Sequence, residues 1–131
     1  MPDLYLIFNH QLTTDQKNAA ISQLGILHFF PLPDELQQKW SQIPPELDTM
    51  TSYLEPLRRW LSDQARPSDF VLIQGDFGAC YLMVAEAFRL NLIPLYSTTK
   101  REAVEDNHAD GTVTLTHQFK HVIFRKYECW V

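Results

Sequence analysis

Short runs of consecutive apolar residues alternate along this chain with longer segments in which apolar residues recur every three or four positions. The runs have the length of buried strands, and the longer segments have the period of amphipathic helices. Strands are predicted over residues 4–8, 26–30 and 70–74, with a fourth that starts at Leu92. Helices are predicted over residues 14–24, from Pro33 to Trp40, from about Ser52, and over residues 79–90.

Local signals agree with this division into helices and strands. Thr13 and Gln16 have the spacing of a capping box, and Gly25 is suited to end the first helix. Pro56 is tolerated only close to a helix start, which is why the third helix is predicted to begin near Ser52.

The C-terminal part has a different pattern. Residues 106–111 form a turn cluster, and residues 112–127 are rich in the Thr, Val, Ile, Phe and Tyr that favour strands. A long hairpin is therefore predicted, with residues 96–104 antiparallel to residues 112–127. The whole pattern predicts one α/β domain over residues 1–131, a mainly parallel Rossmann-like sheet flanked by helices. Right-handed crossovers give the strand order 2-1-3-4, with an antiparallel strand at the edge.

The predicted helix over residues 79–90 is apolar almost all the way round. A helix of this kind is buried on more than one side. Burial inside the chain and burial in a dimer interface both account for the pattern, and the sequence leaves the two open.

Two polar segments follow buried strands directly, and both are predicted to be loops. Gly75, Asp76, Phe77 and Gly78 follow the third strand; Ser97, Thr98, Thr99, Lys100 and Arg101 follow the fourth. In an open parallel sheet, ligands bind outside the carboxyl ends of the strands where the strand order reverses. Asn9 and His10 follow the first strand, so all three segments are expected to open at one edge of the sheet.

The first of these segments has two interpretations. Gly75 and Gly78 could let the backbone cradle a phosphate at the start of the next helix, while Asp76 holds a ribose hydroxyl and Phe77 stacks on a base. Alternatively the segment is an ordinary strand-to-helix turn in which Asp76 caps the helix. It is not a dinucleotide fingerprint, because it lacks the third glycine.

The second segment also stays open between two interpretations. If it is strand, Thr99 and Arg101 share one face while Thr98 and Lys100 share the other, so only one cation points inward. It is either an anion site or a solvated edge whose cations pair with Glu102 and Glu105.

The histidines offer a weaker signal. His10 could act as an acid or base near neutral pH, although a lone histidine is more often a polar loop residue. His117 and His121 would share a strand face too far apart for easy chelation of one metal, so no metal site is expected. Ser97 has no paired base in the sequence, and a hydrolase triad is not supported.

Composition narrows the class of function. The net charge of −5 argues against a general binder of nucleic acid or membranes. Residues 1–99 carry all of this charge, and residues 111–127 hold no acidic residue, so a small anion could be drawn to that end. Cys80 and Cys129 show no disulfide or metal spacing, which indicates a reduced cytoplasmic protein.

Five long segments span nearly the whole chain and carry a resemblance: LYLIFNH, WSQIPPEL, VLIQGDFGACYL, IPLYSTTKRE and THQFKHVIFRKY. With them the chain resembles the small stand-alone CRISPR-associated proteins of type III systems that are related to the CARF-like ring nucleases. The resemblance implies a CARF-like homodimer that linearises cyclic oligoadenylate, most often cyclic tetra-adenylate, and so switches off antiviral signalling. It implies that no metal is needed, and no other cofactor is expected. Because of the acidic net charge, neither duplex nucleic acid nor a membrane is expected as a partner.

On this resemblance, residue roles can be assigned as expectations. Lys100 or Arg101 would stabilise the charge that develops on phosphate, and His10 would transfer a proton. Asn9 with Thr98 or Thr99 would orient phosphate or ribose. A sensor or sponge that binds the ring without cutting it remains the alternative, followed by an ordinary nucleotide-binding enzyme and an adaptor protein.

Overall fold

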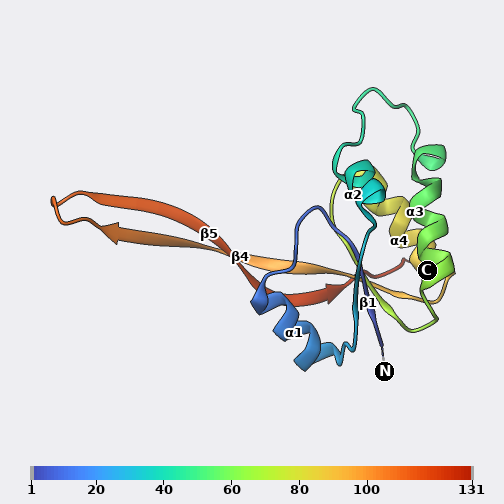
Figure 1. Cartoon of the computed structure of the whole chain (residues 1–131), viewed down its shortest axis with the longest axis horizontal. Helices are drawn as coiled ribbons and strands as arrows, with labels where there is room; N and C mark the ends of the chain where they lie inside the picture. The colour runs from blue at the N-terminus through green and yellow to red at the C-terminus, as the bar shows by residue number, and fades with distance from the viewer. Residues whose placement is uncertain (1, 131) are drawn as a thin grey trace.

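The apolar runs form one five-stranded sheet in the computed structural model, which describes residues 2–130 (Figure 1). Its strands are β1 (Leu4–Ile7), β2 (Phe29–Pro31), β3 (Phe70–Ile73), β4 (Ile93–Asn107) and β5 (Val113–Lys126). Their order is β2-β1-β3-β4-β5, with four parallel strands and β5 antiparallel to β4. The predicted Rossmann-like α/β fold and its strand order are confirmed.

The helices are α1 (Thr14–Leu24), α2 (Asp34–Ser41), α3 (Thr51–Gln64) and α4 (Phe77–Arg89). The capping box of α1 and its left-handed Gly25 cap are both present, and α3 tolerates Pro56 in its second turn. Two boundaries were predicted wrongly: β2 starts three residues later than expected, and α4 starts two residues earlier. No helix in the described part of the chain is long and apolar enough to cross a membrane.

Alternate strand residues separate the core into two layers. Tyr5, Ile7, Val71 and Ile73 pack against side chains of α2, α3 and α4. Leu4, Leu72, Leu95 and Phe124 pack on the opposite side, against Ala20 of α1 and its flanking residues. We call these the α4 side and the α1 side of the sheet (Figure 1).

Packing within the chain accounts for the apolar character of α4. Ala79, Met83 and Ala87 are buried in the core, and Cys80 and Leu82 pack partly against it. Tyr81 of the same helix is 70% exposed, so a dimer interface on this helix stays a prediction.

The hairpin is longer than predicted and extends away from the rest of the molecule (Figure 1). The polar segment after the fourth buried run is therefore strand, not a loop. The register shifts between Ser97 and Thr99, because Val122 and Ile123 bulge out of β5 at this level. Thr98 Oγ1 closes the bulge by donating to Ile123 O and accepting from Ile123 N, both at 3.1 Å. Beyond it the two strands extend away from the rest of the molecule as a two-stranded ribbon (Figure 1); we call residues 99–121 the arm.

Candidate functional site

The strand order reverses between β1 and β3, so the carboxyl ends of these two strands form the edge at which Rossmann-like proteins bind ligands. Asn9 and His10 follow β1 and are exposed. The His10 ring packs edge-on against Phe8, with ring centroids 5.6 Å apart. Within residues 2–130, the side chains of Asn9 and His10 have no hydrogen-bond partner, which leaves both available to a ligand.

The residue after Gln74 is a glycine because a tryptophan packs against its backbone. Trp40 Nε1 donates to Gln74 O at 2.9 Å, and a Cβ at Gly75 would lie 2.8 Å from the same nitrogen. Any side chain here would displace the Trp40 ring. The glycine therefore serves the packing of α2 on the sheet, whatever else the loop does.

The next residues begin α4. Asp76 Oδ2 accepts from Ala79 N at 3.0 Å, so Asp76 is the N-cap of this helix, as its more ordinary interpretation expected. Phe77 is the first helical residue and is 94% exposed. The first N–H groups of a helix have no partner inside the helix, which leaves those of Phe77 and Gly78 available to an anion.

A polar cluster that the sequence did not predict lies on the α1 side at the root of the arm. Ser97 is only 7% exposed; its N–H donates to Gln74 Oε1 at 2.8 Å, and its hydroxyl accepts from Gln16 Nε2 at 3.3 Å. His121 Nδ1 lies 2.5 Å from Ser97 Oγ. The cluster ties β3, β4, β5 and α1 together where the arm leaves the sheet.

His121 is held as a neutral imidazole. Burial lowers its pKa below the ordinary value, and the nearby carboxylate of Asp15 opposes this shift without reversing it. Its Nε2 is buried without a hydrogen-bond partner among the described residues. Ser97 and His121 have no carboxylate to complete a triad, and Ser97 is closed to solvent, so the pair stabilises the arm root and does not form an exposed nucleophile.

The signal for this pair lay in the hairpin itself. A turn at residues 108–111 pairs residues on either side at nearly equal distances, which brings the level of Ser97 close to that of His121. The bulge in β5 shifts the strand register by one residue between Ser97 and Thr99. A bulge is not visible in the alternation of apolar residues.

The four remaining predicted site residues lie along β4. Thr98 uses its hydroxyl on the bulge. Thr99 lies opposite His121 and Arg101 opposite Phe119, so both point to the α1 side. Lys100 lies opposite Lys120 and points to the α4 side. The predicted alternation of the two cations is therefore present, and only Lys100 shares its side of the sheet with the start of α4.

Lys100 and Lys120 place two like charges directly across the ribbon. Such cross-strand pairs are destabilising in the absence of a counter-charge. Glu102 partly supplies one, since its Oε2 lies 3.5 Å from Lys120 Nζ. In the described part of the chain Lys100 makes no ion pair, which leaves its positive charge available on the α4 side of the arm.

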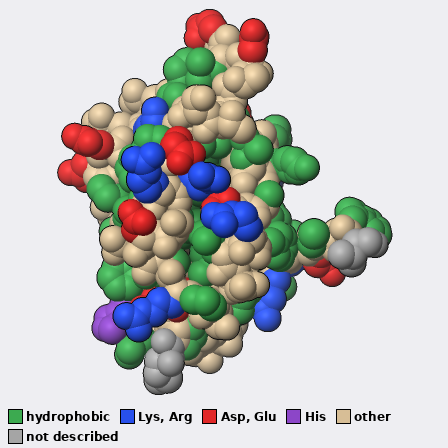
Figure 2. Space-filling view, turned by 90° about the vertical axis from the view of Figure 1, so that its right-hand side faces the viewer, with side chains coloured by type: hydrophobic (Ala, Val, Ile, Leu, Met, Phe, Trp, Pro, Cys, Tyr) green, Lys and Arg blue, Asp and Glu red, His purple; other side chains and the backbone are tan. Residues whose placement is uncertain are grey.

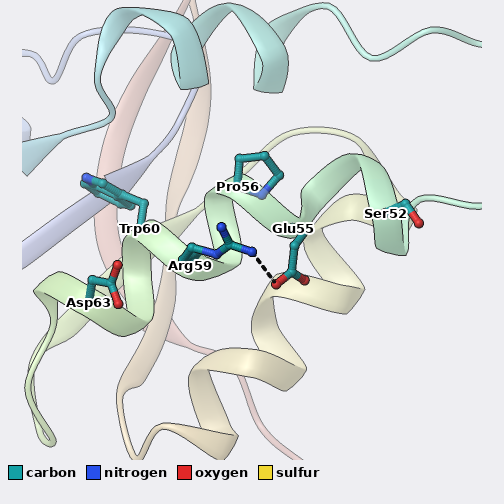
Figure 3. Close-up of a pocket in the computed structure, with 6 residues that line it drawn as sticks. All are labelled: Ser52, Glu55, Pro56, Arg59, Trp60 and Asp63. Atoms are coloured by element: carbon teal, nitrogen blue, oxygen red, sulfur yellow. Dashed lines mark ion pairs between the residues drawn. The ribbon is translucent and has the colours of Figure 1, made fainter.

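The two pockets that the structure describes lie elsewhere. One, of about 400 Å³, is formed along α3 by Ser52, Glu55, Pro56, Arg59, Trp60 and Asp63 (Figure 3). A second, of about 260 Å³, lies between α3 and α4. Ion pairs neutralise part of their charge: Arg59 pairs with Glu55 at 3.8 Å in the first pocket, and Arg58 pairs with Glu86 at 3.8 Å in the second. Figure 2 accordingly shows positive and negative side chains interspersed on this face.

Fold and edge together define a Rossmann-like α/β protein with a projecting two-stranded arm and polar residues at the carboxyl edge of its sheet. The chain belongs to the family described as the "Uncharacterized protein MJ1673 family", whose model matches residues 2–125. It is 51% identical over 127 residues to "Uncharacterized protein MJ1673" of Methanocaldococcus jannaschii, which covers 97% of this chain and 98% of that protein. No solved structure matches the chain.

Proposed function

We propose that the chain binds cyclic oligoadenylate, with cyclic tetra-adenylate as the first ligand to test, on the α4 side of the carboxyl edge and linearises it. The observation that carries the proposal is the presence of three features suited to such a ligand on that side of the sheet. These are the open N-terminus of α4, the exposed Phe77 ring, and the cross-strand lysine pair Lys100 and Lys120.

Each feature suits a different part of such a ligand. Phosphates would accept from the N–H groups at the start of α4 and pair with the lysines. Adenine would stack on Phe77, since aromatic side chains bind bases through their faces. Lys100 lies three residues beyond Ser97, about 10 Å along the strand from the root of the arm.

The proposed reaction needs geometry and charge stabilisation rather than a metal. The ribose 2′-oxygen forms a bond to the adjacent phosphorus, the bond from phosphorus to the 5′-oxygen breaks, and the 2′-hydroxyl proton passes to a base. The leaving 5′-oxygen takes up a proton, so the product is linear with a 2′,3′-cyclic phosphate and a 5′-hydroxyl. Lys100 would stabilise the phosphorane, and His10 is the candidate for proton transfer.

Arg101 and Thr99 point to the other side of the strand, so the register favours Lys100 as the cation that meets the ligand. A homodimer would bring two copies of the edge to one ring and double the positive charge offered by an acidic chain. In the setting that the resemblance implies, cleavage would remove the second messenger of type III CRISPR antiviral signalling.

One observation favours binding without cleavage as a second candidate function. His10 is packed only against Phe8, and within the described residues no carboxylate or carbonyl orients its ring. A base that is not oriented transfers protons poorly. The protein would then act as a sponge for the ring.

The test is incubation with cyclic tri-, tetra- and hexa-adenylate in EDTA, followed by chromatographic separation of ring and linear products. Conversion of one ring that is lost in Lys100→Ala and retained in Lys126→Ala supports the proposed nuclease, because Lys126 lies on β5 opposite Leu95, away from this edge. Intact ring that binds at stoichiometric protein supports the sponge. Neither cleavage nor binding of any ring overturns both.

A further inference from the structure

The two faces of the arm differ in chemistry. The strand register places Ala103, Val113, Leu115, His117 and Phe119 on one face, which we call the apolar face. The other face carries polar and charged side chains at most positions, including Lys100, Glu102, Gln118 and Lys120. If both faces of the ribbon were in contact with water alone, this separation of apolar from polar side chains would not be expected.

The large side chains of the apolar face are open to solvent. Phe119 is 70% exposed, Leu115 59% and Val113 54%. Nothing else in residues 2–130 packs on this part of the ribbon. Because a two-stranded ribbon is marginally stable alone, and because contiguous exposed apolar surface marks an interaction site, this face is suited to a partner.

Two opposite charges flank the centre of the apolar face. Arg101 lies opposite Phe119, two pairs toward the root from Ala103, and Glu105 lies opposite Leu115, two pairs toward the tip. Neither Arg101 nor Glu105 makes an ion pair within the described residues. The face is therefore complementary to its own copy when that copy is turned end for end.

We propose that the apolar face of the arm binds the apolar face of the arm of a second copy, around a two-fold axis at the level of Ala103 and His117. Such an axis stacks β4 on the partner's β4 and β5 on the partner's β5, with opposite directions. Arg101 of each copy then meets Glu105 of the other, and Phe119 of each meets Leu115 of the other. Both relationships occur twice.

The length of the arm agrees with this register. Face-to-face sheets stack about 10 Å apart, a gap that Arg and Glu side chains can span together. Turned about the same axis, the Asn107–Val113 pair at the tip meets the Thr99–His121 pair at the partner's root. The α1 helix contacts β5 near this root, so the overlap of the two arms ends where the body of the partner begins.

This interface requires no ligand and uses the side of the arm opposite Lys100, so it is separate from a contact that would bring two α4-side edges to one ring. A failed cleavage assay therefore leaves it standing, and a monomeric protein that still cleaves the ring would overturn the interface alone.

The first experiment is sedimentation velocity on the full-length chain over a range of concentrations. We expect a dimer, and we expect Phe119→Glu or Leu115→Glu to weaken its dissociation constant by about tenfold or more. Gln118→Glu is the matched control, since it adds the same charge on the opposite face of the same strand and leaves the dimer unchanged. A wild-type monomer at all concentrations, or equal effects of Phe119→Glu and Gln118→Glu, overturns the proposal.

A charge exchange tests the register independently of folding. Arg101→Glu and Glu105→Arg should each weaken dimerisation, because each places like charges across the axis. The double variant restores opposite charges at both places and should recover the wild-type dissociation constant. Single variants that dissociate without recovery in the double variant, with circular dichroism unchanged, would show that these two side chains do not meet.

Discussion

A Cβ placed on Gly75 would lie 2.8 Å from Nε1 of Trp40, the atom that donates to Gln74 O. Trp40 is 2% exposed and anchors α2 to the end of β3. The carboxyl edge of the sheet and the core therefore meet at one glycine, whose backbone is close-packed on one side and open to solvent on the other.

Gly75→Ala should lower the free energy of unfolding by about 1–3 kcal/mol, because an added methyl group forces either the indole or the loop to move. Equilibrium denaturation in urea measures the change. Gly78→Ala is the matched control: its Cβ would lie 3.3 Å from the flexible end of Met50, and alanine is favoured by up to about 1 kcal/mol inside a helix. Equal destabilisation by both variants would show that the Trp40 contact is not the cause.

The parallel part of the fold was predictable because its strands are short, fully apolar and separated by segments of helical period. The continuous apolar runs that contain Leu4 and Leu72 indicate strands buried on both faces. The capping box of Thr13 with Gln16 indicates a helix start from local sequence alone. The start of α4 was predicted too late because Phe77 is exposed, and an exposed aromatic residue does not fit the apolar period of a buried helix.

The site was less predictable because its contacts depend on strand register. Ser97 and His121 are 24 residues apart and meet through a bulged pairing that no local pattern encodes. Thr98 resembles a ligand-binding residue in sequence, yet its hydroxyl satisfies backbone groups of that same bulge. The arm was predicted as a hairpin. Its division into two faces could not be predicted, because it depends on the strand register that pairs Phe119 with Arg101.

Lys100→Ala should raise the thermal stability of the free protein slightly, by roughly 0.2–1 kcal/mol at low salt, because it removes a like charge directly opposite Lys120. The gain should shrink in high salt, which screens exposed charges. Thermal melting at two ionic strengths measures it, with Lys126→Ala as the control. Loss of stability in Lys100→Ala would mean that Lys100 has a compensating partner.

The two cysteines should differ sharply in reactivity. Burial raises the pKa of the Cys80 thiol to about 11, whereas Cys129 is exposed. At pH 8 only about one Cys80 side chain in a thousand is thiolate, the form that reacts. Titration of the native protein with Ellman's reagent should show one fast and one slow thiol, and Cys129→Ser should remove the fast one. Two fast thiols would contradict the burial of Cys80.

Folding stability should fall as the pH drops through the range in which His121 titrates. Its folded pKa is lowered by burial from the ordinary 6.5, so the unfolded chain takes up a proton on this ring at a higher pH than the folded chain does. The contribution of His121 is complete above about pH 6.5 and is lost progressively below it. His121→Gln keeps a side chain that can hydrogen-bond to Ser97 and does not titrate. Urea denaturation at pH 7.5 and pH 5.5 should therefore show a smaller loss of stability in this variant than in the wild type. An equal loss in both would mean that the Ser97–His121 pair accepts a proton without cost, and that the unpaired Nε2 reaches solvent.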